Sequence, residues 1–213
     1  MKCSRCGGEN PAEMRFCGAC GAPLADARAQ PHVPLGEHAG ERRFMTVMFC
    51  DVVESTPLAE QLDPEDFREV LTGYQIACAR AIERFSGHAA QWVGDGVLAY
   101  FGYPRAHEDD AQRGVHAALG ILDGVRALNA RLSESLGISL QVRVGLHSGV
   151  VVAGEMGAGE TREQLAIVGE TPHIAARVQA VAPPGSVLVT ETTRQLVDGE
   201  FETETLGAKS LRG

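Results

Sequence analysis

Apolar and polar positions divide the chain into an irregular N-terminal part and a regular remainder. From about Glu41 onward, short apolar runs alternate with longer amphipathic stretches. The run 44–50 is almost wholly apolar, which is typical of a buried central strand. The stretch 64–85 instead repeats its apolar residues every three or four positions, as in a helix packed on one side. Asp63 fits the N-cap of this helix and Pro64 its first turn.

The rest of the regular part continues the alternation of strands and helices. Strands over 90–93 and 97–101 flank a Gly-Asp-Gly turn and predict a hairpin. The pattern further predicts a helix over about 107–133, strands over 140–147 and 150–153 joined at Ser148-Gly149, a glycine-rich loop over 154–163, a strand over 164–168, a helix over 171–181, a strand over 186–190, and then a short helix and a terminal strand. The order β-α-β-β-α-β predicts an α+β domain with a ferredoxin-like fold.

The first forty residues are organised differently. Residues 1–24 contain four of the six cysteines, whereas residues 25–40 contain two prolines and no apolar periodicity. A segment of the latter composition is typical of a linker. We therefore expect a small module at 1–24, a linker at 25–40 and one larger domain at 41–213.

The N-terminal cysteines form two CxxC pairs, Cys3 with Cys6 and Cys17 with Cys20. Each pair lets two thiolates converge at a tight turn, and four thiolates in tetrahedral array suit one Zn²⁺ at about 2.3 Å. Two disulfides are the alternative, which a reducing compartment disfavours. A module this small is expected to fold only with its metal bound. The pattern resembles the short zinc ribbons at the front of many bacterial regulatory proteins.

Composition narrows the classes of function. The chain has 213 residues, 44% hydrophobic and 22% charged, with a net charge of -9. This acidic balance argues against a general nucleic-acid binder and against an electrostatic membrane anchor. No apolar run approaches the roughly 20 residues that span a bilayer, and the polar N-terminus is not a secretory signal. We expect a cytoplasmic protein without nucleic-acid or membrane partners.

Two aspartates follow or interrupt predicted strands. Asp51 comes directly after the apolar strand, and Asp95 lies at the tip of the Gly94-Asp95-Gly96 hairpin. In a ferredoxin-like sheet the first strand lies beside such a hairpin, so the two carboxylates are expected to meet. Mg²⁺ prefers one or two carboxylates together with phosphate oxygens, and two such ions can serve phosphoryl chemistry. Taken alone, either aspartate would be a cap or turn residue.

Four ordered blocks carry a family resemblance. They are FCDVVEST at 49–56, VGDGVLAYFG at 93–102, VRVGLHSG at 142–149 and VGETPHIAAR at 168–177. With these blocks, residues 41–213 resemble the class III nucleotide cyclases, the catalytic domain of adenylyl and guanylyl cyclases. The chain looks most like the bacterial branch that joins a zinc ribbon to a cyclase domain.

The resemblance implies an enzyme and its site. The ribose 3′-hydroxyl of a nucleoside triphosphate attacks the α-phosphate, and pyrophosphate leaves. Two Mg²⁺ or Mn²⁺ ions would be held by Asp51, Asp95 and the Val52 carbonyl, and Arg177 would neutralise charge that develops in the transition state. The triphosphate would lie against Val53, Glu54, Ser55 and Thr56. The family builds this site between two domains, so a homodimer is implied.

Four positions depart from the family pattern. Gln91 stands where a lysine reads the base, and Ala166 where its acidic or threonine partner stands. His173 replaces the asparagine that orients the ribose, although a neutral imidazole can donate one hydrogen bond. Glu54 replaces a glycine beside the triphosphate. Intact Asp51, Asp95 and Arg177 favour an active cyclase, with ATP rather than GTP as its substrate. The four departures favour the alternative, a degenerate cyclase fold for nucleotide sensing or dimerisation, and a two-metal, polymerase-like transferase has no motif of its own here.

Overall fold

The computed structural model describes residues 2–3, 5–11, 17–20, 22, 40–156 and 163–208. The chain divides into two compact units, residues 1–39 and residues 40–213. Apart from Gly40, the segment predicted as a linker lies outside the described residues. None of the helices in the described ranges is both long and apolar enough to cross a membrane.

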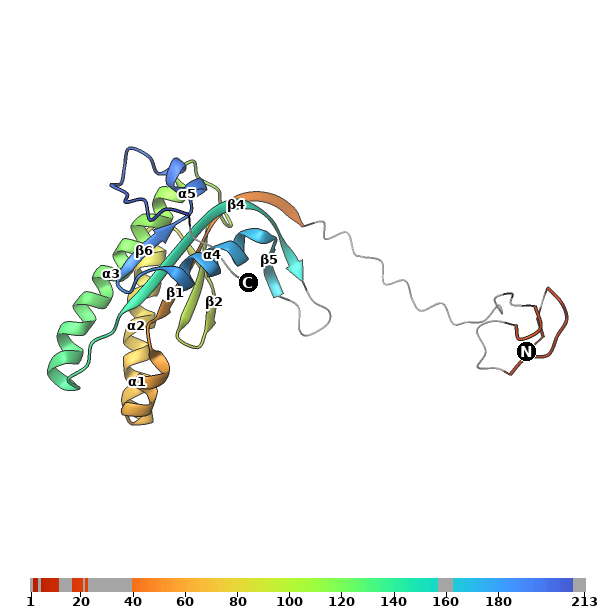
Figure 1. Ribbon diagram of the computed structural model, residues 1–213, viewed down its shortest axis with the longest axis horizontal. Helices are drawn as coiled ribbons and strands as arrows, with labels where there is room; N and C mark the ends of the chain where they lie inside the picture. Colours follow the sequence, from red (N-terminus) through yellow and green to blue (C-terminus); the bar gives the residue numbers. More distant parts are fainter. Residues whose placement is uncertain are drawn as a thin grey trace. The chain divides into compact units, whose positions relative to one another are not determined.

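The second unit is built on one mixed sheet (Figure 1). Its strands are β1 (Glu41–Val52), β2 (His88–Val93), β3 (Gly96–Phe101), β4 (Val142–Met156), β5 (Glu163–Val168) and β6 (Ser186–Val189). The strand order is β2-β3-β1-β4-β5, with β6 parallel to the first part of β4 and every other pair antiparallel. Its helices are α1 (Ser55–Gln61), α2 (Pro64–Arg84), α3 (Asp110–Ser135), α4 (Glu170–Val181) and α5 (Glu191–Leu196). The elements β1-α2-β2-β3-α3-β4 form the ferredoxin-like core, which confirms the predicted α+β fold.

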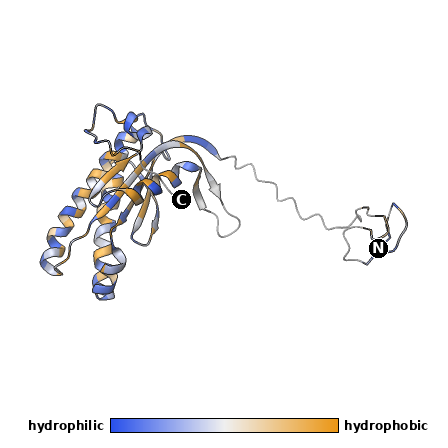
Figure 2. Cartoon of the chain, viewed as in Figure 1, coloured by the Kyte–Doolittle hydropathy of each residue, from blue (hydrophilic) through white to orange (hydrophobic). Residues whose placement is uncertain are grey.

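Side chains of β1 alternate between the two faces of the sheet and contribute to an apolar cluster on each face. Met48 and Cys50 belong to the main apolar cluster, which contains residues of α2 and α3. Met45 and Val47 belong to a smaller cluster that includes Ala175 of α4. The long helices α2 and α3 lie side by side on the first face, while α4 packs against β4 and β1 (Figure 1). Both long helices carry hydrophobic and hydrophilic residues side by side, as their single buried face requires (Figure 2).

Strand β4 corrects one prediction. The strands predicted over 140–147 and 150–153 are one continuous strand, and Ser148-Gly149 is not a turn. Ser148 pairs with Thr46 in the ladder to β1, and their buried hydroxyl groups lie 2.7 Å apart. A Cβ at position 149 would lie 2.6 Å from Oγ1 of Thr171 in α4. This glycine therefore permits close packing of α4 on the strand, a role that sequence pattern alone does not separate from a turn.

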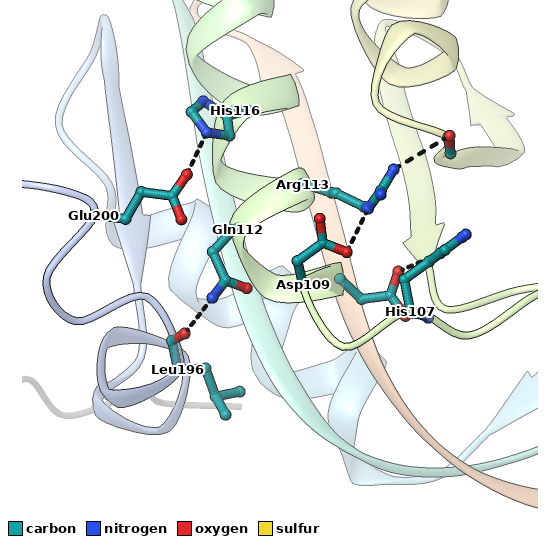
Figure 3. A network of polar contacts seen from close by, with 9 residues as sticks. His107, Asp109, Gln112, Arg113, His116, Leu196 and Glu200 are labelled. Carbon is teal, nitrogen blue, oxygen red and sulfur yellow. Dashed lines mark hydrogen bonds and ion pairs between the residues drawn. The ribbon is translucent and has the colours of Figure 1, made fainter.

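Polar contacts attach the end of α5 and the segment after it to α3 (Figure 3). His116 Nε2 lies 2.7 Å from a Glu200 carboxylate oxygen, and the His116 ring contacts the ring of Phe201 at 4.7 Å. Gln112 Nε2 donates to the Leu196 carbonyl at 2.9 Å. No strand follows α5 within residues 197–208, although the sequence predicts one, and residues 209–213 lie outside the described residues. Side-chain contacts with α3 hold this segment in place of a strand ladder.

Candidate functional site

Asp51 and Asp95 come together at one end of the sheet. The ladder between β1 and β3 pairs Cys50 with Val97, so the last residues of β1 lie beside the turn that carries Asp95. Gly96 is the first residue after that turn, and a Cβ there would lie 3.6 Å from Oδ1 of Asp51. The turn therefore approaches the Asp51 carboxyl closely. Both aspartates are half-buried. The topology thus joins two carboxyl groups that are 44 positions apart in the sequence.

The electrostatics of Asp51 reflect this arrangement. Burial, the negative charge of Asp95 and a hydrogen bond with Asp95 raise the pKa of Asp51 from 3.8 to about 6. The Val52 backbone and the positive charge of Arg143 oppose this increase. Two ionised carboxyls in contact are costly, and divalent cations remove that cost. The donor set fits Mg²⁺ or Mn²⁺, which prefer carboxylate oxygens.

Arg143 is a charged residue of the site that sequence reasoning did not single out. The ladder between β1 and β4 places it directly opposite Asp51. Its Nε is buried and has no hydrogen-bond partner in the described part of the chain. A buried guanidinium nitrogen without a partner is costly, and an incoming anion would satisfy it. Arg143 belongs to one of the quoted blocks, but only the strand register shows what it faces.

The turn after β1 contains the four residues predicted to hold phosphate. The Val53 N–H donates to the Gln141 carbonyl at 2.8 Å, so it already has an acceptor. Glu54 is exposed and has left-handed backbone geometry, with φ 55° and ψ 37°. Ser55 begins α1 and is half-buried, whereas Thr56 is exposed. The left-handed conformation explains why a glycine suits position 54 and makes glutamate there a strained choice.

The remaining predicted site residues lie on other elements. Gln91 is exposed on β2, and Ala166 is buried on β5, so they occupy the two end strands of the main sheet path. Gln91 pairs with Leu98, which packs against the apolar cluster under α4, whereas Ala166 precedes Ile167 of that cluster and so lies on the opposite face of its strand. His173 and Arg177 are exposed and lie one turn apart on α4.

An exposed apolar patch lies where β1, β4 and β5 extend past the helices. Phe44 pairs with Val150, and Val152 pairs with Val168, so the four side chains share one side of the sheet. Their exposed fractions are 53%, 51%, 41% and 47%. A contiguous group of exposed apolar side chains is typical of an interaction surface.

The cysteines of the first unit cluster as the CxxC spacing predicts. All four sulfur atoms lie within 4.8 Å of one another. Sγ of Cys3 lies 3.7 Å from Sγ of Cys20, and Sγ of Cys6 lies 3.5 Å from Sγ of Cys17. Four ligands at about 2.3 Å around a tetrahedral zinc ion lie about 3.8 Å apart. All four cysteines are free thiols, so the predicted geometry fits zinc better than two disulfides.

The thiol environment agrees with a metal site. Backbone N–H groups of Ala19 and Cys20 lower the pKa of Cys17 to about 6. The Ala22 N–H has a lowering effect on Cys20, but the Cys6 thiol and burial raise the pKa of Cys20 to about 12. Four crowded thiols cannot all ionise without a cation, and Zn²⁺ supplies that cation.

Asn10 connects the two cysteine pairs and was not identified from the sequence. Its Nδ2 donates to the Gly8 carbonyl at 2.9 Å and to Sγ of Cys17 at 3.4 Å. Its Oδ1 accepts from the Gly18 N–H at 2.9 Å. Such a second layer of hydrogen bonds orients metal ligands. An asparagine between two CxxC pairs is the signal that could have revealed it.

Two family models match the chain. The model described as adenylate and guanylate cyclase catalytic domain matches residues 38–213, and the model described as zinc-ribbon domain matches residues 2–24. Together they match both structural units.

Individual proteins similar to this chain include cyclases. An uncharacterised protein, R02095, from Rhizobium meliloti (strain 1021) is 35% identical over 175 residues, covering 82% of this chain and 16% of that protein. Adenylate cyclase 1 from the same organism is 29% identical over 146 residues, covering 68% of this chain and 22% of that protein. The chain thus spans less than a quarter of these relatives. The GTP-bound guanylate cyclase domain of RhGC from Catenaria anguillulae has a TM-score of 0.71 and 26% identity, covering 78% of this chain and 89% of that one.

Proposed function

Residues 38–213 belong to the adenylate and guanylate cyclase catalytic domain family, and on this premise we propose that the chain converts a nucleoside triphosphate to its 3′,5′-cyclic monophosphate and pyrophosphate. The contact between the Asp51 and Asp95 carboxyls carries the proposal, because it supplies a metal-binding pair where the family chemistry requires one. The raised pKa of Asp51 supports the same role, since a strained acidic pair is typical of functional sites.

Asp51, Asp95 and the Val52 carbonyl would hold two Mg²⁺ or Mn²⁺ ions. When bound, such ions neutralise triphosphate charge and activate the attacking hydroxyl. The ladder of β1 with β4 fixes the backbone of Asp51, and the Val93–Gly96 pair of the β2–β3 ladder closes the two-residue turn that carries Asp95, so neither aspartate lies in a long loop.

Two arginines are assigned complementary roles in this proposal. Arg143 faces Asp51 across the strands and would offset the negative charge of the triphosphate in the same protomer. Arg177 is exposed on α4 and would act on the α-phosphate from a second copy of the chain. His173, one turn earlier on the same helix, would donate a hydrogen bond to the ribose.

A homodimer would bring these halves together. Phe49 and Leu98, paired half-buried apolar residues on the same face of the sheet as Asp51 and α4, are the apolar surface that supports this proposal. A guanylyl cyclase domain of the same fold, from Blastocladiella emersonii, is described as a non-canonical dimer in one solved structure and as a monomer in another. With two-fold symmetry each protomer would provide the metals for one site and Arg177 for the other.

ATP is the proposed substrate in preference to GTP. Gln91 offers both a donor and an acceptor to a purine edge, whereas the methyl group of Ala166 offers neither. Discrimination between bases depends on matched buried polar groups. We therefore expect weak discrimination, with measurable turnover of both nucleotides.

The second candidate function is a nucleotide-sensing or dimerisation module without turnover. The geometry of Glu54 favours it, because a carboxylate stands in a strained left-handed turn beside the proposed phosphate site. Such a module would still bind a triphosphate through the aspartate pair. The two candidates differ only in product formation.

The deciding experiment incubates the pure full chain with Mn²⁺ or Mg²⁺ and either ATP or GTP, and measures cyclic nucleotide and pyrophosphate. We expect product from the wild type and none from Asp51→Ala or Asp95→Ala, with Asp123→Ala as an exposed, matched control that retains activity. Triphosphate binding without product would establish the sensor instead. Retained turnover in both aspartate variants would refute the assigned site.

A mixing experiment tests the shared site. Asp51→Ala and Arg177→Ala are each expected to be inactive. In an equal mixture with free exchange, half of the dimers carry one intact site, so we expect about a quarter of wild-type activity. If the mixture remains inactive while gel filtration shows exchanged dimers, the assignment of Arg177 to the opposite protomer is wrong.

We also propose that the first unit holds one structural Zn²⁺ through its four cysteines. The sulfur spacing and the match of residues 2–24 to the zinc-ribbon model support this assignment. Metal analysis of the purified chain should give one zinc per molecule, and a Cys3→Ser variant should lose it. A wild-type protein without stoichiometric zinc would contradict the assignment.

A further inference from the structure

A groove of about 410 Å³ runs along the outer surface of the α2–α3 pair. The two helices are antiparallel and approach closely through small residues. A Cβ on Gly73 would lie 3.0 Å from the Leu128 side chain, and one on Gly124 would lie 3.1 Å from Cβ of Ala77. These small residues leave a concave floor between the helices.

The groove is elongated. Its α2 residues extend from Gly73 to Phe85, and its α3 residues extend from Gly120 to Arg131. At 1.5 Å per residue, each stretch is roughly 16 to 18 Å long. Three turns of a further helix, or a short extended peptide, have that length. Ile76, which lines the groove, is 46% exposed and offers an apolar contact.

Three arginines, Arg80, Arg84 and Arg131, line the groove, and all are exposed. Among the described residues none of the three forms an ion pair. Other arginines do so, as with Arg113 to Asp109 at 2.7 Å and Arg194 to Glu191 at 2.8 Å. The whole chain has a net charge of -9, so an uncompensated basic groove is unusual on its surface.

Local roles do not account for all three cations. Arg84 lies in the last turn of α2, where a positive charge suits the helix dipole, and it stacks over Phe85 at 5.5 Å. Arg80 lies a turn earlier, and Arg131 lies on the other helix before its last turn. Neither has an equivalent explanation.

The distribution of charge selects the kind of partner. Arg131 lies near the Gly73 end of the groove, because Leu128 contacts Gly73, whereas Arg80 and Arg84 lie near the Gly120 end. A single phosphate group cannot reach both ends of a groove this long, and a flat membrane surface cannot fill a concave floor. Carboxylates spaced along a helix can contact both ends at once.

We propose that the α2–α3 groove docks an acidic amphipathic helix of a protein partner, with small apolar side chains on the groove floor and carboxylates against Arg80, Arg84 and Arg131. Binding at this surface does not depend on the proposed cyclase activity, because none of these residues belongs to the aspartate site. Association should weaken as salt concentration rises.

The test uses the full chain and a synthetic, fluorescein-labelled helical peptide of about 16 residues, with alanine and leucine on one face and glutamate on both flanks. Anisotropy titration should give saturable binding. The variant R80E/R84E/R131E should bind at least about tenfold more weakly, and Ile76→Ser several-fold more weakly. Arg126→Glu, an exposed α3 arginine outside the groove, should leave binding unchanged. Circular dichroism checks that each variant is folded.

Several results would overturn the proposal. They are no saturable binding by the wild type, equal binding by the triple variant, and equal binding of a peptide with lysine in place of glutamate. Co-sedimentation with phosphatidylserine vesicles that requires the three arginines, without peptide binding, would assign the groove to lipid. Self-association that the triple variant abolishes, again without peptide binding, would assign it to a second copy.

Discussion

Replacing Asp51 by asparagine should stabilise the metal-free protein and remove its response to Mn²⁺. In the wild type, burial and the Asp95 charge raise the pKa of Asp51 from 3.8 to about 6. At neutral pH the Asp51 carboxyl is therefore ionised in the folded protein, where burial and the Asp95 charge make the ionised form costly. Asparagine has nearly the same shape and carries no charge, so it removes that cost.

The magnitude follows from linkage between ionisation and folding. A pKa that rises from 3.8 to about 6 corresponds to about 3 kcal/mol at most, at 1.36 kcal/mol for each tenfold change. Asp51 is only half-buried, so solvent screening reduces the expected gain to roughly 1–2 kcal/mol. For a chain of this size, that gain raises Tm by roughly 2–8 °C.

The pH dependence of stability tests a second time whether Asp51→Asn stabilises the protein. A carboxyl with a raised folded-state pKa favours folding below its ordinary pKa, and this contribution is lost as pH rises through about 6. The variant should therefore match the wild type near pH 4 and exceed it above pH 6. Mn²⁺ should stabilise the wild type increasingly as pH rises through 6, and should leave the variant nearly unchanged.

Thermal unfolding followed by circular dichroism measures these effects, with EDTA or with Mn²⁺. Asp123→Asn is the matched control, because its side chain is 72% exposed and its replacement should change stability by less than about 0.5 kcal/mol. A lower Tm for Asp51→Asn in EDTA at neutral pH would refute the electrostatic reasoning. So would a difference from the wild type that does not vary with pH.

Four other features lead to measurable expectations. Gly145→Ala would put a Cβ into the backbone of Gln179, so it should lower the free energy of unfolding by about 1–3 kcal/mol in a denaturant titration, and an unchanged value would contradict the packing of α4 on β4. Glu54→Gly should raise that free energy by about 0.5–1 kcal/mol because it relieves a left-handed conformation, whereas a decrease would show that the glutamate has a stabilising contact. His116→Ala should cost about 1 kcal/mol and speed proteolysis near Phe201, since it removes ring contacts and a carboxylate partner; unchanged cleavage would count against this attachment. Removing zinc with a chelator should unfold the ribbon and make its four cysteines reactive to thiol reagents, while the thermal transition of the second unit stays where it was; loss of both transitions would show that the units fold together.

The core of the fold was predictable because its signals are local. The apolar run around Val47 and the helical spacing after Pro64 each specify one element, and the turn at Asp95 specifies the hairpin. Their order then restricts the topology to a ferredoxin-like sheet. The convergence of Asp51 with Asp95 follows from that topology, and the sulfur cluster follows from the CxxC spacing.

What the sequence did not provide depends on pairing between distant segments. Gly149 looks like a turn residue, and only the position of Thr171 shows that it serves helix packing. Arg143 can be assigned to the site only from the strand register, which pairs it with Asp51. The backbone strain at Glu54 likewise needs the observed dihedral angles. In each case the deciding contact is made by residues that no local pattern connects.

The exposed position of Arg177 bears directly on how the proposed site would be completed. In water, an arginine near a phosphate gains little, because solvent screens the charge. The aspartate pair is half-buried at the end of β1, whereas Arg177 lies on the outer side of α4. A second copy placed over the half-buried residues Phe49 and Leu98 would exclude water from both groups at once. Coverage of this kind would strengthen the electrostatic contribution of Arg177 while leaving the fold of each protomer unchanged, so dimerisation itself would act as the final step of site assembly.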